Sequence, residues 1–168
     1  RLERHLDGRP CGLVVCNAGL YPDKGENLAD GYPAAMWAET FAVNVTGVFL
    51  TVQAMLPSLQ AAAGLHGLAR VAVIASRMGS TTRAPGGSYI YRASKAAAVN
   101  LTRNLATDLA GLGIAVGAYH PGWVRTAMGG AAAEISVDAA AEALIARFEA
   151  LDLDRTGCFE TWEGSPHP

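Results

Sequence analysis

Tyr91 and Lys95 are spaced in a way that could support proton transfer. They lie four residues apart in the stretch 88–95, so on a helix their side chains share one face. A lysine ammonium beside a phenol stabilises the phenolate and lowers the tyrosine pKa from about 10. The spacing makes Tyr91 a candidate general acid or base near neutral pH. Tyr89 lacks this support, because the residue four positions after it is Ala93.

The alternative for this pair is an exposed helix pair without a chemical role, since tyrosine and lysine at this spacing are common by chance. Lys95 is one of only two lysines, the other being Lys24, in a chain with eleven arginines. Lysine carries a compact ammonium and arginine a planar fork of donors, and the two are not interchangeable. The scarcity of lysine therefore favours a specific use for Lys95.

Small and polar residues follow two of the apolar runs that are typical of strands. Asn-Ala-Gly at 17–19 follows the run 13–16, and its small side chains let a ligand approach the backbone. Ser76 follows the run 71–75, and its hydroxyl can donate to a substrate oxygen. Each segment has an ordinary alternative, which is a turn at 17–19 and a loop cap at Ser76.

Two other places could contribute polar groups. Pro121 and Gly122 force a turn after the run 114–119, and the backbone beyond it could meet a flat amide, with Thr126 adding a hydroxyl. The alternative there is a plain turn between a strand and a loop. Asn44 lies within an apolar helical pattern, where its amide is unfavourable by propensity. Its side chain either faces solvent or holds something buried, and the spacing does not separate the two.

An alternation of predicted strands and helices must position these residues. Apolar runs indicate strands at 13–16, 71–75, 114–119 and 157–162, of which the first suits a strand buried on both faces. Helical spacing or helix-favouring composition predicts helices over 34–60, 88–112 and 137–151. Ser136 can cap the last of these helices, with Asp138 in its first turn. The order predicts an α/β fold with a doubly wound parallel sheet, whose ligands bind at the carboxyl ends of the strands.

Composition limits the classes of function. The 168 residues predict a single domain, and a net charge of −2 without a basic half argues against nucleic-acid binding. Cys11, Cys16 and Cys158 form no CxxC pair, so neither a zinc site nor a disulfide framework is expected. Reduced thiols favour a cytoplasmic protein. No uninterrupted apolar run reaches the ~18 residues that a membrane helix needs, so no membrane partner is expected.

The order of these motifs resembles that of the short-chain dehydrogenase/reductase family, a Rossmann-fold group of NAD(P)-dependent enzymes. In chain order the matches are CNAG at 16–19 for the family's NNAG, Asn44 for its helix asparagine, Ser76 for the serine of S-x-x-G, Tyr91 and Lys95 for YxxxK, and 121–126 for PGxxxT. More narrowly, HPGWVRTAMGG at 120–130 is similar to the sniffer and C-factor-like branch of carbonyl reductases.

The resemblance implies a role for each of four residues. Tyr91 would act as the general acid/base, and Lys95 would lower its pKa and bind the nicotinamide ribose. Ser76 would orient the substrate carbonyl, and Asn44 would hold a water in a proton relay. Contacts with NAD or NADP would come from Asn17, Ala18, Gly19, Tyr91, Lys95, Pro121, Gly122, Val124 and Thr126. The choice between the two dinucleotides is not readable, and residues 127–136 would form a mobile substrate loop.

The chain departs from the family pattern at its beginning. No TGxxxGxG motif occurs, and the run 13–16 corresponds to the family's fourth strand, so the first three strands and the glycine-rich loop have no counterpart. We expect residues 1–168 to be the C-terminal catalytic portion of a longer product; the alternative is a short protein without the cofactor half. By itself the chain would expose the strand 13–16 as an apolar sheet edge and be poorly soluble.

Two functions follow from these observations. The first is an oxidoreductase of the carbonyl reductase or alcohol dehydrogenase type, acting on a small carbonyl or alcohol. The second is a truncated, non-catalytic binding or dimerisation module. In the family the helices corresponding to 34–60 and 88–112 commonly form subunit contacts, so a homodimer or homotetramer is expected at full length.

Overall fold

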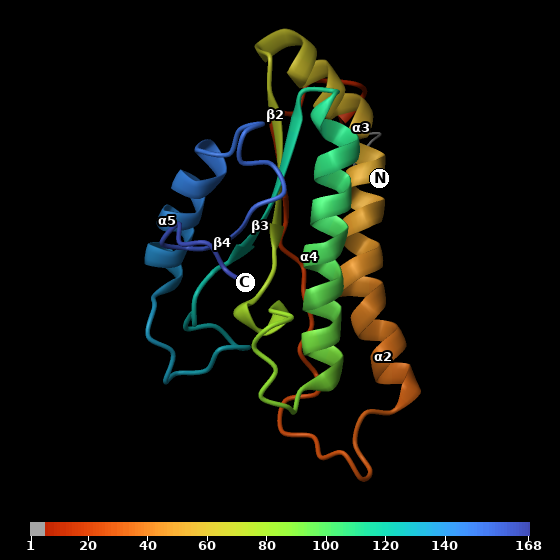
Figure 1. Cartoon of the computed structure of the whole chain (residues 1–168), viewed down its shortest axis with the longest axis vertical. Coiled ribbons are helices and arrows are strands. Elements are labelled where there is room, and N and C mark those ends of the chain that lie inside the picture. The colour runs from red at the N-terminus through yellow and green to blue at the C-terminus, as the bar shows by residue number, and fades with distance from the viewer. Residues whose placement is uncertain (1–5) are drawn as a thin grey trace.

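A four-stranded parallel sheet forms the centre of the protein (Figure 1), whose computed structural model describes residues 6–168. The strands lie side by side in the order β1 (Leu13–Cys16), β2 (Ala69–Ile74), β3 (Ile114–His120) and β4 (Phe159–Thr161). In the register, Val71 of β2 lies between Val14 of β1 and Val116 of β3. Each pair of parallel neighbours is joined by a crossover containing a helix, as the alternating sequence pattern predicts.

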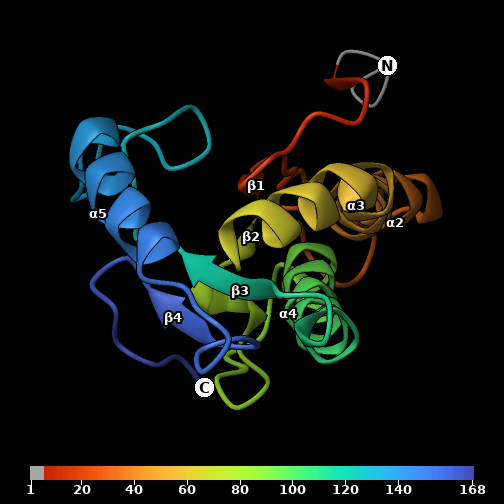
Figure 2. The ribbon, with the colours of Figure 1, turned by 90° about the horizontal axis from the view of Figure 1, so that it is seen from above.

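Helices cover both faces of this sheet (Figure 2). One face carries the continuous helical segment of α2 (Ala34–Phe41), the π-helical η1 (Ala42–Thr46) and α3 (Gly47–His66), together with α4 (Tyr89–Ala110). The other face carries α5 (Val137–Glu149). A short 3₁₀ turn, η2 (Arg77–Gly79), follows β2. This arrangement confirms the predicted Rossmann-like α/β fold.

The predicted helix over 34–60 differs from the structure in length and regularity. It continues to His66 and ends where Gly67, at φ 77°, donates its N–H to the carbonyl of Ala63. Only glycine adopts this left-handed conformation without strain, so Gly67 is a C-terminal cap. Within the segment, the π-helical residues of η1 include Asn44.

The other boundaries lie within two residues of the predictions. The helices predicted over 88–112 and 137–151 occupy Tyr89–Ala110 and Val137–Glu149. Ser136 caps α5 as expected, since its Oγ accepts a hydrogen bond of 3.1 Å from the Ala139 N–H. The strand predicted over 157–162 is confined to Phe159–Thr161.

The strand β1 is covered on one face only, so the prediction that it is buried on both faces is wrong. Val14 and Cys16 are buried, whereas Leu13 and Val15 are 40% and 41% exposed. The helix α5 packs over β2 and β3 instead, where Leu144 and Phe148 contact Ala72 and Tyr119. Among residues 6–168, β1 pairs with β2 alone, so it forms an edge of the sheet in the described part of the chain.

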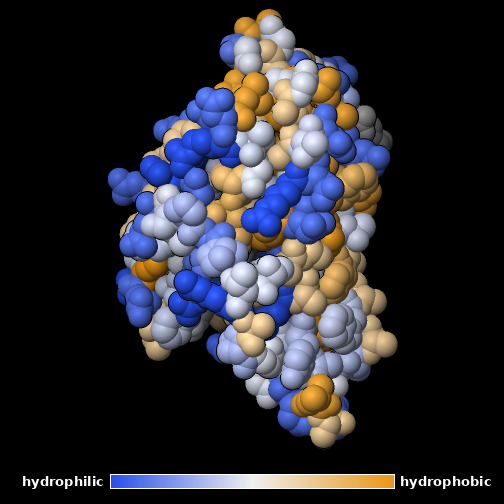
Figure 3. Space-filling view, in the orientation of Figure 1, coloured by the Kyte–Doolittle hydropathy of each residue, from blue (hydrophilic) through white to orange (hydrophobic). Residues whose placement is uncertain are grey.

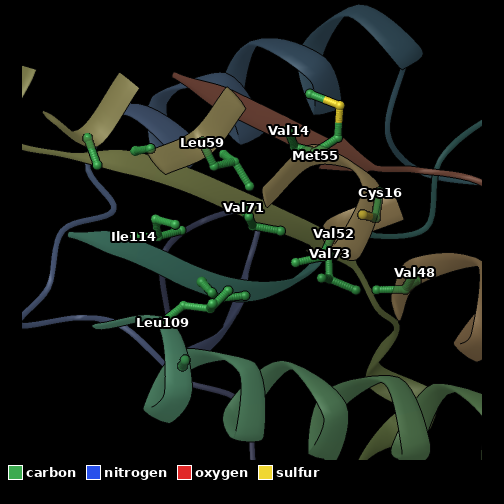
Figure 4. Packing of buried hydrophobic residues seen from close by; sticks show 14 of the residues in the cluster. Val14, Cys16, Val48, Val52, Met55, Leu59, Val71, Val73, Leu109 and Ile114 are labelled. Carbon is green, nitrogen blue, oxygen red and sulfur yellow. The ribbon is translucent and has the colours of Figure 1, made fainter. Parts of the chain in front are cut away.

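The main core fills the space between the sheet and the helices α3 and α4 (Figure 4). Its members come from every element around that space and include Val14, Val52, Met55, Leu59, Val71, Val73, Leu109 and Ile114. Leu59, Val71, Val73 and Ile114 have no exposed surface. Burial of these aliphatic side chains fixes α4 against β2 and β3, and thereby fixes the side chains at the start of α4.

The helical segment Ala34–His66 is long and apolar enough to cross a membrane by length and composition. Its buried residues, Val48, Val52, Met55 and Leu59 among them, pack on the sheet, so it serves as a core helix of this domain. Its outer side keeps apolar residues such as Phe49, Leu50 and Leu65 exposed. Figure 3 shows apolar surface on the α3 side of the molecule.

Candidate active site

Four residues predicted from the sequence come together at the carboxyl ends of β1 and β2. Ser76 follows β2, Tyr91 and Lys95 lie in the first turns of α4, and Asn44 comes from η1. Their exposed fractions are 8%, 7%, 4% and 1% in that order. Polar and charged groups buried this deeply need partners inside the protein, and those partners define the geometry of the site.

Lys95 lies between the sheet and the Tyr91 ring. Its Nζ donates a hydrogen bond of 2.8 Å to the carbonyl of Ile74 and lies 5.8 Å from the centroid of the Tyr91 ring. Burial lowers the pKa of Lys95 to about 8. This position excludes the alternative of an exposed helix pair. Tyr89, in contrast, is 39% exposed and packs edge-on against Tyr32, as expected for a residue outside the site.

The pKa of Tyr91 is raised, which contradicts the prediction that Lys95 lowers it. Desolvation of the buried phenol is the largest cause, a hydrogen bond with Ser76 opposes it, and the nearby Tyr21 and Asp23 raise the pKa further. The Lys95 ammonium is directed at the carbonyl of Ile74, so its attraction for the phenolate does not outweigh the cost of burying that charge.

Ser76 caps a turn, which is one of the two alternatives that the sequence presented; its contact with a substrate oxygen stays a prediction. Its Oγ accepts a hydrogen bond of 3.1 Å from the Met78 N–H and so caps η2, and its side chain is near enough to the Tyr91 phenol to lower the pKa of that group. Gly79 allows this arrangement, because a Cβ at this position would lie 2.8 Å from the backbone carbon and oxygen of Lys95. The turn can therefore pack directly on α4, which brings Ser76 to Tyr91.

Asn44 is buried and holds other parts of the chain, which decides between its two predicted environments. Its Oδ1 accepts a hydrogen bond of 2.8 Å from the Leu20 N–H, and its Nδ2 donates to the Leu20 carbonyl at 3.0 Å. The same Nδ2 donates to Ser94 Oγ at 2.9 Å. A Cβ on Gly19 would lie 3.3 Å from Lys95 Nζ and 3.5 Å from Asn44 Oδ1, so the backbone at Gly19 adjoins both groups.

The remaining predicted contacts lie in the segments 17–18 and 121–126. Asn17 and Ala18 are exposed just beyond β1. Gly122 turns the chain after β3 with φ 87°. The Thr126 hydroxyl accepts from the Gly129 N–H at 3.1 Å and donates to the Val124 carbonyl at 3.4 Å. That hydroxyl, expected to meet a flat amide, is engaged within its own loop.

The predicted substrate loop 127–136 is held by several hydrogen bonds to residues 123–125. Val124 and Ile135 form a parallel bridge, and the indole of Trp123 donates a hydrogen bond of 2.9 Å to the carbonyl of Gly129. The Arg125 guanidinium donates to the carbonyls of Ala133 and Glu134. The stem of the loop thus has its own hydrogen-bond network; its mobility stays a prediction.

Sequence analysis missed two residues of the site, Tyr21 and Asp23. The Tyr21 ring stacks on Tyr91 with centroids 4.1 Å apart and planes 22° apart. Asp23 has no exposed surface, and its carboxylate accepts hydrogen bonds from the N–H groups of Ile90 and Tyr91. Both lie in a loop rich in turn residues, and no local spacing connects them to a helix 67 residues further on.

A metal centre has no support in the described part of the chain. Residues 6–168 contain no group of three or more His, Cys, Asp or Glu side chains arranged to hold a metal ion. Cys11, Cys16 and Cys158 are free thiols, and burial raises the pKa of Cys16 to about 11.

The parallel sheet with helices on both faces defines the class of protein by its fold, a Rossmann-like α/β domain, with Ser76, Tyr91 and Lys95 buried at the carboxyl edge of that sheet. The chain belongs to the short chain dehydrogenase family, whose sequence profile matches residues 5–150. It is similar to C-signal of Myxococcus xanthus, with 37% identity over 161 residues that cover 95% of this chain and 93% of that protein.

Solved structures agree with this assignment. The NADPH-bound carbonyl reductase from chicken fatty liver superposes with a TM-score of 0.87 at 31% identity, over 98% of this chain and 68% of that chain. The carbonyl reductase Sniffer of D. melanogaster gives 0.90 at 26% identity, over 98% and 69%. Together with C-signal, these matches confirm the branch that the motif at 120–130 predicted.

The chain spans a different share of its various relatives. It covers 93% of C-signal but 41% to 44% of several curated dehydrogenases. The activities of those longer proteins therefore belong to those proteins, and for this chain they are proposals.

We predict that Gly79→Ala destabilises the protein by about 1–3 kcal/mol, because the new methyl group meets the backbone of α4 and has no flexible side chain to displace. Chemical denaturation of the intact protein measures this change in the free energy of unfolding. Gly64→Ala in α3 is the matched control, since nothing lies within 4 Å of its Cβ, and it should stabilise the helix by about 0.5–1 kcal/mol. Equal effects of the two substitutions would contradict the close packing of η2 on α4.

Proposed function

We propose that the protein is an NAD(P)-dependent oxidoreductase that interconverts a small carbonyl compound and its alcohol. The observation that carries this proposal is the buried Tyr91 phenol, with the Ser76 hydroxyl and the Lys95 ammonium beside it, in a member of the short chain dehydrogenase family. The carbonyl reductases that superpose on the chain support the same substrate class.

The nicotinamide ribose is the part of the cofactor that these residues fit. Lys95 has three N–H donors, one of which is used by the carbonyl of Ile74, so two remain for ribose hydroxyls. Gly19 leaves the space beside Lys95 and Asn44 free of a side chain. Within residues 1–168, the proposed contacts lie at the nicotinamide end of the cofactor, because no glycine-rich loop for the pyrophosphate occurs among them. When bound, the cofactor supplies or accepts a hydride.

In the proposed reduction, Tyr91 donates the proton from its Oη to the substrate carbonyl oxygen. Because its pKa is raised, the phenol carries its proton at neutral pH, and the same shift makes it a weaker acid than a free tyrosine. Ser76, already at Tyr91, provides a second hydroxyl that orients the same oxygen. Asn44, whose amide is held by Leu20 and Ser94, is proposed to support the water-mediated return of the proton beside Lys95.

We predict that Tyr91→Phe in the intact protein lowers carbonyl reduction by at least about a hundredfold, the low end of a general acid's contribution. The change removes the Oη proton and keeps the ring that stacks on Tyr21. Turnover is measured by the loss of NAD(P)H absorbance with a panel of small carbonyl compounds.

Tyr89→Phe is the matched control for this substitution. It removes a phenol two residues away that lies outside the buried site, so turnover should stay near the wild-type value. Full activity of Tyr91→Phe would refute the assignment of the acid/base.

We predict that the KM for the dinucleotide rises as the pH increases through about 8, the pKa of Lys95. Burial lowers this pKa, so the ammonium that binds ribose is present below that pH and is lost above it. His120, with a pKa of about 4, stays neutral throughout. Initial rates at varied NAD(P)H from pH 6 to pH 9.5 measure this dependence. Substitution of the exposed Lys24 by Met should leave the profile unchanged, and a KM that is constant over this range argues against ribose binding by Lys95.

A second candidate function is a non-catalytic binding or dimerisation module. C-signal, of which this chain covers 93%, favours it, because that relative is nearly as short as this chain. The exposed apolar residues of α3, such as Phe49 and Leu50, would then serve a partner or a second copy. If the protein is the proposed oxidoreductase, we propose that its subunits contact each other through α3 and α4.

We predict that residues 1–168 by themselves bind NADPH weakly, with a Kd at least about tenfold above that of the chicken carbonyl reductase. The reason is that their sequence lacks the glycine-rich loop whose backbone N–H groups hold a pyrophosphate. Titration of NADPH fluorescence, with the chicken enzyme as reference, measures both values. Equal Kd values for the two proteins would show that NADPH binding does not depend on that loop.

A further inference from the structure

The segment Leu20–Asp23 contacts two helical parts of the site, η1 and α4. The backbone of Leu20 pairs with the Asn44 amide through two hydrogen bonds of 2.8 and 3.0 Å. The Tyr21 ring lies on the Tyr91 ring at 4.1 Å. Asp23 bonds to the first turn of α4. These four residues come directly after the strand β1 and Gly19, so they connect the sheet edge to both η1 and α4.

Asp23 supplies the N-terminal cap of α4. Its Oδ2 accepts hydrogen bonds from the Ile90 N–H at 2.9 Å and the Tyr91 N–H at 3.2 Å, and its Oδ1 lies 3.3 Å from the same Tyr91 nitrogen. The first N–H groups of a helix have no partner within the helix, and its N-terminus favours negative charge. A carboxylate without exposed surface is thereby stabilised, and the start of the helix is fixed to the loop.

The residue that precedes α4 in the chain does not perform this task. Ser88 has φ 47° and ψ 46°, and no side-chain hydrogen bond from it caps the helix. Its Oγ lies 2.7 Å from Tyr21 Oη instead, so the segment Leu20–Asp23 holds Ser88 as well. The helix that carries Tyr91 thus takes its cap from a residue 67 positions earlier in the chain.

We propose that Asp23 is the positioning residue for Tyr91, because its carboxylate holds the backbone N–H of Tyr91 itself and sets where the phenol stands relative to Ser76. The catalytic part of this inference rests on the proposed function, whereas the capping part does not. Tyr21 adds to the positioning, since it covers one face of the Tyr91 ring and limits the directions in which the ring can move.

The charge of Asp23 also acts on the phenol. Asp23 and Tyr21 both raise the pKa of Tyr91, after desolvation, while the hydrogen bond with Ser76 lowers it. Lys95 faces the ring from α4. The other ionisable groups on elements packed against α4 include Glu39 of α2 and Arg77 of η2, which are exposed, and His120 of β3, which is neutral near pH 7.

The first test measures the cap by hydrogen exchange in the intact protein, without any assay of activity. In Asp23→Ala the amides of Ile90 and Tyr91 should exchange at least about tenfold faster than in the wild type, because they lose their acceptor. Asp138→Asn is the matched control, since Asp138 is an exposed carboxylate in the first turn of α5. Unchanged exchange at residues 90 and 91 in Asp23→Ala would overturn the proposal.

The second test separates positioning from a general loss of structure. Asp23→Asn keeps an acceptor oxygen for the N–H groups but removes the charge, so it should retain kcat within a few-fold and shift the pH midpoint of kcat to lower pH. Asp23→Ala should lower kcat by about tenfold or more, because small displacements of an acid group are costly. Asp138→Asn should change neither quantity.

The outcomes distinguish this inference from the proposed function. If Tyr91→Phe abolishes turnover while Asp23→Asn and Asp23→Ala match the wild type in kcat and pH midpoint, Asp23 does not position the phenol and the inference fails alone. If Tyr91→Phe stays active, the proposed function fails, and hydrogen exchange still decides the cap. Where Asp23→Ala does not fold, the same measurements on Asp23→Asn decide the proposal. A neutral amide oxygen accepts more weakly than a carboxylate, so exchange at residues 90 and 91 moderately faster than in the wild type and a lower pH midpoint support it, and wild-type values count against it.

Discussion

The buried amide of Asn44 is the interaction on which the site depends. It joins three segments that are distant in sequence, because it bonds to both backbone groups of Leu20 and to the hydroxyl of Ser94. Ser94 in turn donates to the carbonyl of Tyr91 at 2.9 Å. An amide without solvent must satisfy its groups internally, so its position fixes the positions of its partners. The π-helical turn η1 interrupts the regular helix at this residue, as such turns often do at functional sites.

Burial then determines the electrostatics of the site. The Tyr91 phenol and the Lys95 ammonium are both withdrawn from water, which favours the neutral form of each group and moves their pKa values in opposite directions. The result is a tyrosine that holds its proton beside a lysine that can lose its own close to physiological pH. The proposed reduction uses that tyrosine proton, and the charge of Lys95 is the property of the site most sensitive to pH.

Local sequence patterns predicted the parts of the fold and site that depend on spacing along one element. The four-residue separation of Tyr91 and Lys95 and the position of Ser76 after a strand are of this kind, and so is the alternation that gives a parallel sheet. Sequence alone could not predict the cap by Asp23, because it depends on a contact across 67 residues. It also gave the wrong direction for the pKa of Tyr91, since depth of burial is a property of the assembled core. Similarly, the coverage of β1 depends on where α5 packs.

The central claim is that this site reduces a carbonyl group, and the most direct measurement follows the hydrogen itself. Intact protein is incubated with NADPH carrying deuterium at C4 and with small carbonyl compounds, and the products are examined by mass spectrometry. The account predicts an alcohol with deuterium on the former carbonyl carbon, formed in amounts that exceed the enzyme. Protein that binds the dinucleotide yet transfers no deuterium to any carbonyl in the panel would contradict it and favour the non-catalytic module.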